Sequence, residues 1–404
     1  MSGDRIPASV AVSAVPGRVV HLLERFNDEV LDLLGPTTAA LSQSSVDQVV
    51  VVIDEPHRRA LLTRFDDSIE LVLVPPDSDL LTQWRLLGDA FARTLAERPV
   101  KAIHLHGFVA SLIAEYALRK VPQAVPVPIF YSPHDSRTLR PLRWVATLAQ
   151  WIAHAFMPRR EALAIGHGAP EVRALHGMSH QSVRLVEGPV SAPFFEAVGA
   201  PARHPLIIGA SRTHNLRAVE AFDQLAVLLG GGALQLGFNW IGPVNSVSSA
   251  RLQAANVGVY EAGDDAERAS RLAGGWLYVA LGGNRGFPLC LAEAMAAGLP
   301  CIAIDSPFHR DMVRHGETGY LCRSQTEIID RIAQLIDTPR LRLRMGRAAR
   351  TLARERFSES TFREALLSAY QFGDEIPVTV PGSTDTTVPE AAPLSLPTPA
   401  QEFP

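Results

Sequence analysis

A single carboxylate, Glu293, stands in a short helical stretch that is otherwise apolar, between a glycine-bearing loop and the apolar strand predicted for residues 301–304. The loop carries Gly282, Gly283 and Gly286. A buried carboxylate is costly unless it is paired or hydrogen-bonded, so we expect Glu293 either to have an internal partner or to meet a ligand. Open α/β sheets bind ligands at such loop-to-helix junctions, and the backbone N–H groups at the helix start favour an anion there.

Two histidines lie at the ends of predicted strands in the first half of the chain. His106 ends the stretch 103–106, and His134 follows the stretch 127–131. A neutral imidazole can hydrogen-bond a hydroxyl group or steady a developing charge. The alternative is a structural role, which is the usual one for a lone histidine. Because two histidines lie at neighbouring strand ends, the sequence supports a functional role and a structural role about equally.

A family resemblance is carried by two segments. Residues 286–300, which include Phe287 and Glu293, and residues 316–321 resemble the donor-site signature of two-domain glycosyltransferases of the GT-B type, family four. The resemblance covers the C-terminal half well and the N-terminal half weakly. It implies two doubly wound Rossmann-like α/β domains facing a cleft, and the transfer of a sugar from a nucleotide diphosphate sugar to an acceptor hydroxyl. It also implies retention at the anomeric carbon.

The resemblance assigns roles to several residues. Glu293 would hold the ribose, Arg212 would contact the diphosphate, and His134 would face the donor sugar with His106 on the acceptor side. Arginine suits the diphosphate because its planar fork donates two parallel hydrogen bonds. Arg217 is favoured over His214 as a second cation. The donor site implied in this way consists of Arg212, Arg217, Gly283, Arg285, Gly286, Phe287 and Glu293, with His134 and Glu293 as catalytic residues. We expect replacement of Glu293 by alanine to abolish donor binding while the chain stays folded.

Arg285 is a departure from the family signature, which has a glutamate at this position. A cation here could stabilise the leaving diphosphate, pair with the carboxylate of a uronic acid donor, or point to solvent in a site that has lost its activity. The first strand lacks the glycine-rich loop of the family, and residues 187–190 replace its Asn-Gly-Val-Asp turn. These departures leave two alternatives open, which are a catalytically silent subunit or regulator that binds nucleotide sugars and a sugar-nucleotide epimerase on the same fold.

The net charge and the cysteine content limit which kinds of partner the protein can have. The net charge of −4 and a pI of about 6.4 exclude general affinity for nucleic acid. The cysteines Cys290, Cys301 and Cys322 have apolar contexts and no metal-ligand spacing, which is typical of buried thiols in a reducing compartment. We therefore expect no metal and no cofactor beyond the sugar donor. The sequence has no signal-peptide pattern and no membrane-length apolar run, which predicts a cytoplasmic protein. The family resemblance implies a part in polysaccharide or glycoconjugate biosynthesis.

The order of the predicted elements gives the domain organisation. Alternating strands and helices predict one α/β domain over 1–200 and a second over 201–358. The resemblance implies that the N-terminal domain is the acceptor side and that the C-terminal domain binds the nucleotide sugar. A helix over 359–372 would cross back to the first domain, and the Pro/Thr/Ser-rich residues 373–404 would be disordered. The strands are predicted at 18–22, 48–53, 69–74, 103–106, 127–131, 183–186, 206–209, 234–237, 257–260, 276–279 and 301–304.

Two further segments have competing interpretations. Residues 139–157 predict a helix flanked by arginines, which packs on the sheet or rests on an anionic membrane surface beside a carbohydrate or glycolipid acceptor. The triplet Asp77–Asp79 resembles the metal-binding motif of the other large glycosyltransferase class. The favoured interpretation is a turn in which Asp79 caps the next helix.

Overall fold

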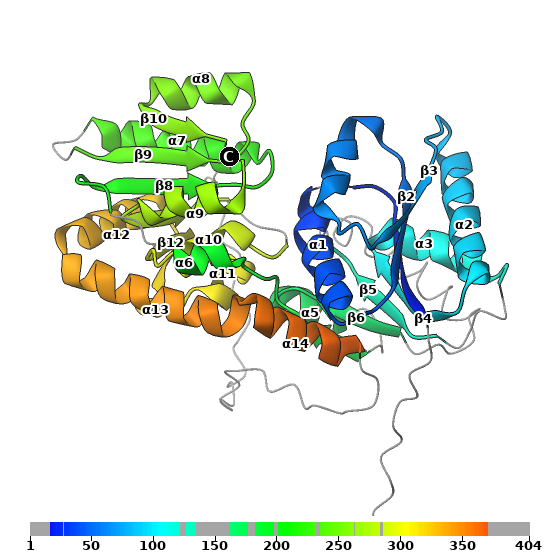
Figure 1. Cartoon of the computed structure of the whole chain (residues 1–404). Coiled ribbons are helices and arrows are strands. Elements are labelled where there is room, and N and C mark those ends of the chain that lie inside the picture. Colours follow the sequence, from blue (N-terminus) through cyan, green and yellow to red (C-terminus); the bar gives the residue numbers. More distant parts are fainter. Residues whose placement is uncertain are drawn as a thin grey trace, which may run out of the picture.

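The structure is a computed structural model that describes residues 17–26, 28–121, 127–134, 162–176, 182–197, 201–231, 235–261, 263–282 and 286–370. These residues form two parallel sheets, each covered by helices, and Figure 1 shows the sheets as two separate bodies joined by α14 and by the chain near α5 and α6. The predicted helix at 139–157 and the predicted tail at 373–404 lie outside the described residues.

The first sheet has seven strands in the order β3-β2-β1-β4-β5-β6-β7, and the pairs are parallel. Its strands are β1 (Arg18–Leu23), β2 (Gln48–Ile53), β3 (Glu70–Val74), β4 (Val100–His106), β5 (Ile129–Ser132), β6 (Ala162–Gly166) and β7 (Ser182–Leu185). The continuous apolar run of β2 is typical of a strand buried on both faces. The strand order reverses between β1 and β4, which makes their carboxyl ends the switch point of a doubly wound sheet.

The second sheet repeats this order with six strands, β10-β9-β8-β11-β12-β13. Its strands are β8 (Leu206–Ala210), β9 (Gly237–Ile241), β10 (Val257–Tyr260), β11 (Leu277–Ala280), β12 (Cys301–Ile304) and β13 (Gly319–Cys322). The switch point here lies between β8 and β11. Two doubly wound parallel sheets confirm the fold class predicted from the sequence.

The helices follow the strands along the chain. Around the first sheet they are α1 (Asp28–Gln43), the 3₁₀ helix η1 (Pro56–Arg64), α2 (Leu80–Glu97), α3 (Phe108–Leu118) and α5 (Ala169–His176). The remaining helices are α6 (Ala192–Glu196), α7 (Leu216–Gly230), α8 (Ser246–Ala254), α9 (Asp265–Ala273), α10 (Leu289–Ala296), α11 (Pro307–Met312), α12 (Gln325–Asp337), α13 (Pro339–Phe357) and α14 (Glu359–Tyr370). None of the described helices combines the length and the apolar character that crossing a bilayer requires.

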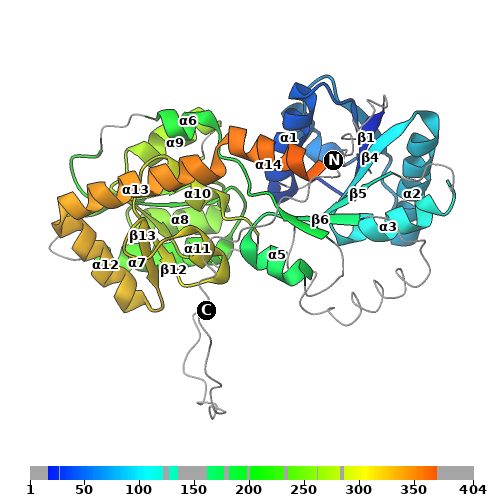
Figure 2. The same cartoon turned by 90° about the horizontal axis from the view of Figure 1, so that it is seen from below.

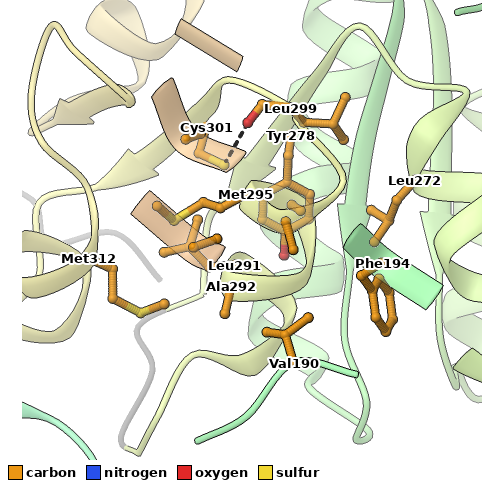
Figure 3. Packing of buried hydrophobic residues seen from close by; sticks show 14 of the residues in the cluster. Val190, Phe194, Leu272, Tyr278, Leu291, Ala292, Met295, Leu299, Cys301 and Met312 are labelled. Atoms are coloured by element: carbon orange, nitrogen blue, oxygen red, sulfur yellow. Dashed lines mark hydrogen bonds between the residues drawn. The ribbon is translucent and has the colours of Figure 1, made fainter. Parts of the chain in front are cut away.

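Each sheet buries alternate residues of its strands on opposite faces, as the period of two of a strand requires. In β1, Val20 and Leu22 pack with α2 and α3, whereas Leu23 packs with α1 and Val19 packs with α1 and α14. Figure 3 shows the corresponding core of the second sheet, where α10 supplies Leu291, Ala292 and Met295 to a cluster around Tyr278.

The second core begins earlier in the chain than the predicted boundary at residue 200. Val190 and Phe194 are buried against the α9 and α10 side chains of the second sheet (Figure 3). The Val190 N–H donates to the Phe357 carbonyl at 2.7 Å, which attaches this segment to the end of α13. Residues 190–196 therefore pack with the second sheet.

Helices α13 and α14 run end to end from the second sheet to the first (Figures 1 and 2). Phe362, Leu366 and Ala369 of α14 lie in one buried cluster with Val19 of β1 and Leu41 of α1. Helix α14 thus completes the face of the first sheet that α1 leaves uncovered.

The structure corrects one predicted strand. The sequence placed a strand at 234–237, but β9 spans Gly237–Ile241. The buried side chains of Phe238, Trp240 and Ile241 make the sheet core, whereas Leu236 is only partly buried. The prediction followed the alternation around Leu234 and missed that a half-buried Asn239 is compatible with a strand.

Asp79 has the structural role that the sequence favoured. Its carboxylate accepts from the Thr82 N–H at 2.8 Å and caps α2. Asp77 accepts from the Asp79 N–H at 2.8 Å, so the triplet forms a helix-start turn.

Candidate functional site

A group of buried histidines lies towards the carboxyl ends of β1, β4, β5 and β6, at and beside the switch point of the first sheet. We call it the histidine cluster, and its members are His21, His104, His106, His134 and His167. His21 comes from β1, His104 and His106 come from β4, and His134 follows β5. The predicted residues His106 and His134 are in direct contact, because His106 Nδ1 lies 2.8 Å from His134 Nε2.

The cluster continues in both directions from His106. His106 Nε2 lies 3.1 Å from His21 Nδ1, and His21 Nε2 lies 3.2 Å from Gln48 Oε1. On the other side the rings of His134 and His167 stack with centroids 5.5 Å apart. Burial lowers the pKa of His21 and that of His167 to about 4. Burial and the neighbouring rings lower the pKa of His106 and of His134 well below the usual value, so the cluster is neutral at pH 7.

His134 has an unusual backbone and an unpaired nitrogen. Its φ of 52° lies in the left-handed region, which histidine adopts rarely outside constrained positions. Its Nδ1 is buried and has no hydrogen-bond partner among the described residues. Such a buried, unpaired nitrogen is costly, and it is suited to a hydrogen bond with a ligand.

Three members of the cluster have the composition of a metal site. Ligand nitrogens of His21, His104 and His106 all lie within 4.8 Å of one another. Each of these rings, however, already uses both nitrogens. His104 binds Ser132 Oγ at 2.9 Å and Tyr370 OH at 2.6 Å, and the partners of His21 and His106 are given above. A metal ion here would replace several existing hydrogen bonds.

Glu293 lies inside the second domain between two arginines. Its side chain is fully buried, and Arg212 Nε donates to Oε1 at 2.5 Å while Arg268 Nε donates to Oε2 at 2.9 Å. Of the two possibilities that the sequence left open, the structure therefore shows an internal partner. The ribose-binding role of Glu293 remains a prediction, and it requires one of these arginines to move aside.

Arg212 is shared by further carboxylates. Its Nη2 donates to Asp265 Oδ1 at 2.6 Å, and its Nη1 lies 3.8 Å from Asp32 Oδ1 on α1 of the first sheet. Burial lowers the pKa of Arg212, but these carboxylates outweigh it and raise the pKa above its usual value. The guanidinium is thus always charged, and a diphosphate would compete with carboxylates for its hydrogen bonds.

The glycine-bearing loop approaches the histidine cluster from the second sheet. A Cβ built on Gly286 would lie 3.6 Å from the carbonyl oxygen of His134. Phe287 packs edge-on against Phe357 and also meets Gly188, where a Cβ would lie 2.7 Å from the Phe287 ring. Gly283 and Arg285 lie outside the described residues. The structure therefore brings Gly286, Phe287 and His134 together across the two sheets.

Two predicted cations are placed apart from these contacts. Arg217 and His214 are exposed at the start of α7, and neither forms an ion pair with another described residue. Glu187, in the altered turn, pairs with Arg356 at the end of α13, which gives this turn a role in joining the domains. Desolvation raises the pKa of the Cys290 thiol to about 11, so this thiol is protonated at neutral pH, although Cys290 is only partly buried, whereas Cys301 and Cys322 are buried as predicted.

Sequence reasoning missed several residues around Glu293 and several members of the histidine cluster. Arg268 was not named, although it lies on the buried stripe of α9 with Ala269 and Leu272, which is a detectable signal for a buried charge. Asp32 lies far from Arg212 in sequence, and no local pattern indicates that contact. His21 and His104 were read only as parts of strands.

A family model and curated relatives match the C-terminal part of the chain. Residues 245–352 match the model "Glycosyl transferases group 1". N-acetyl-alpha-D-glucosaminyl L-malate synthase of Bacillus anthracis is 35% identical over 97 residues, which is 24% of this chain. The chain thus matches about a quarter, 24%, of that relative's length.

Solved structures match over nearly the whole chain. The Anabaena protein HepE, in complex with UDP and glucose, has a TM-score of 0.67 at 14% identity, with 87% of this chain and 98% of that chain covered. Sucrose-phosphate synthase from Thermosynechococcus elongatus has the same TM-score and the same coverage of 87% and 98%, also at 14% identity. At these identities the matches show the fold, which is that of the GT-B glycosyltransferases.

Proposed function

We propose that this protein transfers a sugar from a nucleotide diphosphate sugar to an acceptor hydroxyl. The proposal starts from a C-terminal region that matches the group 1 glycosyltransferases and from a fold of the GT-B type. The reaction proceeds with retention and without a metal, and the acceptor is a carbohydrate or a glycolipid, with peripheral membrane contact where the acceptor is a lipid. Three further curated relatives, from Haemophilus influenzae, Bacillus subtilis and Homo sapiens, are glycosyltransferases or a mannosyltransferase by name, which does not favour an epimerase.

One observation carries this proposal. The backbone of Gly286, in the loop that begins the family signature, meets the backbone of His134 at the switch-point edge of the other sheet. A sugar held by the first of these segments therefore lies beside the second. His134 supplies a neutral imidazole with an unpaired acceptor nitrogen to a hydroxyl of that sugar or of the acceptor.

The second sheet supplies the donor side of the reaction in this proposal. Arg212 and Gly282 follow β8 and β11, the strands that flank its switch point. The nucleotide lies against this edge. Arg212 exchanges a carboxylate partner for the diphosphate, and Glu293 exchanges an arginine partner for the ribose. Complexes of HepE with UDP-glucose and of the pneumococcal O-GlcNAc transferase GtfA with UDP and GlcNAc support a donor of this class.

A donor panel tests the proposal. The protein is incubated with nucleotide diphosphate sugars that differ in base and sugar, and its melting temperature is recorded. A donor at about 100 times its Kd stabilises the folded state by about 2.7 kcal/mol, which is a clear shift. No shift with any donor at millimolar concentration contradicts the proposal.

Two substitutions at one position locate the site. Replacement Gly286→Ala places a Cβ in ordinary contact with His134, whereas Gly286→Leu fills the space between the loop and His134. We expect the alanine variant to keep the donor-induced shift and the leucine variant to lose it. Equal shifts in both variants would move the donor away from this contact.

A further inference from the structure

The histidine cluster contains a continuous chain of hydrogen bonds that begins far from the loop of the second sheet. It runs from Gln48 Oε1 to His21 Nε2 at 3.2 Å, from His21 Nδ1 to His106 Nε2 at 3.1 Å, and from His106 Nδ1 to His134 Nε2 at 2.8 Å. Gln48 lies at the start of β2, and its side chain is buried. Each link joins neighbouring strands of the first sheet or the segment after β5.

The orientation of the Gln48 amide is fixed by its other contacts. Gln48 Nε2 donates to the Thr38 carbonyl at 2.8 Å and to Ser42 Oγ at 2.9 Å. A backbone carbonyl is an acceptor only, so the NH₂ group must face Thr38. The carbonyl oxygen of the amide therefore faces His21, and it can only accept.

The rest of the chain follows from the chemistry of a neutral imidazole, which has one N–H and one bare nitrogen. Because Gln48 Oε1 accepts, the hydrogen of His21 is on Nε2 and its Nδ1 is bare. His106 must then donate from Nε2 to that nitrogen, which leaves its own Nδ1 bare. His134 donates from Nε2 in the same way, and its Nδ1 is left as an acceptor.

Protonation of His21 or His106 would break this order, because two donors would then face each other, and protonation of His134 would remove its acceptor nitrogen. Burial and the neighbouring rings hold the pKa of His106 and of His134 well below the usual value. His167 behaves similarly beside them. Its Nδ1 lies 2.7 Å from the Val186 carbonyl and must donate to it, so its Nε2 is also a bare acceptor without a described partner.

We propose that Gln48 is a positioning residue, which acts through His21 and His106 to hold His134 in the tautomer whose Nδ1 accepts a hydrogen bond from a substrate hydroxyl. The hydroxyl assignment rests on the proposed glycosyl transfer, whereas the tautomer assignment does not. Two adjacent rings with bare acceptor nitrogens attract a hydroxyl donor and repel a carboxylate or a phosphate, so the group bound there is a neutral sugar hydroxyl.

Removal of the Gln48 acceptor allows the whole chain to reverse. His21 can then donate from Nδ1 to His106, His106 can donate from Nδ1 to His134, and His134 must carry its hydrogen on Nδ1. The acceptor at the site becomes a donor, although no residue near the substrate has changed. This reversal distinguishes a positioning role of Gln48 from a merely structural one.

The test is a long-range ¹H–¹⁵N spectrum of protein labelled with ¹⁵N-histidine, which separates protonated ring nitrogens from bare ones. His134 is assigned from the signals that vanish in His134→Asn. In the wild type we expect a bare Nδ1 and a protonated Nε2 on His134. A protonated Nδ1 in the wild type overturns the proposal, and this measurement needs no variant that perturbs Gln48.

Matched variants then test the role of Gln48. Gln48→Leu removes the acceptor and is expected to raise the protonated Nδ1 population of His134, with kcat/KM lower by about tenfold, which corresponds to one hydrogen bond. Ser42→Ala removes a contact of Gln48 Nε2 and leaves the His21 link intact, so it should behave as the wild type.

The remaining outcomes separate this proposal from others. An unchanged His134 tautomer in a folded Gln48→Leu variant overturns it. A stoichiometric metal in the purified protein that is lost in His21→Ala also overturns it, because His21, His104 and His106 would then be ligands. If the tautomer is as expected but no nucleotide sugar is bound or turned over, the assignment of Gln48 stands and the proposed function fails.

Discussion

Glu293 is a fully buried anion whose two oxygens are bound by Arg212 and Arg268. Arg268 is nearly as buried as its partner, so its charge depends on Glu293 for compensation. Arg212 has other carboxylates to turn to, since Asp265 and Asp32 also contact it. The two arginines therefore respond differently to the loss of Glu293, and Arg212 is the one that can exchange partners for a ligand.

The first prediction concerns stability at this residue. Replacement Glu293→Ala leaves the buried guanidinium of Arg268 without its counter-charge, so we expect the free energy of unfolding to fall by about 3–5 kcal/mol. This changes the earlier expectation that the variant loses only donor binding. The measurement is urea denaturation followed by circular dichroism.

Glu220→Ala is the matched control for this prediction. Glu220 lies 3.7 Å from Arg251 at the surface, with both side chains more than a third exposed. Its removal should change the free energy of unfolding by less than about 1 kcal/mol. Equal effects of the two substitutions would show that Glu293 is solvated in solution.

At the scale of elements, sequence patterns predicted what local chemistry determines. The run of valines in 48–53 predicted β2 to the residue, and Asp79 predicted the start of α2. Contacts made by residues far apart in sequence were not predictable in this way. The link from Asp32 to Arg212 spans the two sheets, and Arg268 reads as a surface residue unless the apolar neighbours on its own helix face are considered.

Helix α14 gives the second prediction. Leu366 is almost fully buried between α1 and the first sheet, so Leu366→Ala should lower the free energy of unfolding by about 2–5 kcal/mol. Glu364, which is exposed on the same helix, serves as the control and should tolerate alanine within about 0.5 kcal/mol. A Leu366→Ala variant as stable as Glu364→Ala would mean that α14 does not pack on the first sheet in solution.

At the scale of the whole molecule, the switch-point edges of the two sheets differ in charge. The edge of the first sheet presents neutral histidines, and the edge of the second presents arginines held by carboxylates. The sequence analysis placed the donor residues in the second domain, with His134 of the first domain facing the donor sugar, and that assignment stays a prediction. His106 ends β4 and His134 follows β5, as the sequence predicted, and parallel topology brings these two strand ends together.

The third prediction concerns acid stability of the whole fold. The folded state lowers the pKa values of the histidine cluster below the usual 6.5, to about 4 for His21 and His167, so the unfolded chain binds more protons. The cluster's stabilisation is complete above pH 6.5 and is lost as the pH falls towards 4. Over this pH range, each such histidine lowers the free energy of unfolding by about 1.4 kcal/mol for every pH unit of acidification. Glu171, whose pKa burial raises to about 7, acts in the opposite direction and offsets one histidine.

Denaturant unfolding at a series of pH values checks this prediction. We expect the free energy of unfolding to fall between pH 6.5 and 5 with a slope steeper than about 1.4 kcal/mol per pH unit, because several histidines titrate together. A flat profile over this range would show that the histidines bind protons equally in the folded and the unfolded chain, and that burial does not lower their pKa values.

The most direct test of the account is the release of nucleotide diphosphate from a donor that shifts the melting temperature. The protein is incubated with that donor at high enzyme concentration, with and without simple carbohydrate acceptors, and the free nucleotide diphosphate is quantified by ion-exchange chromatography. We predict release above the spontaneous rate, faster with an acceptor, and strongly reduced in His134→Ala with the donor still bound. Tight donor binding without release in any of these reactions would contradict glycosyl transfer and indicate a binding subunit.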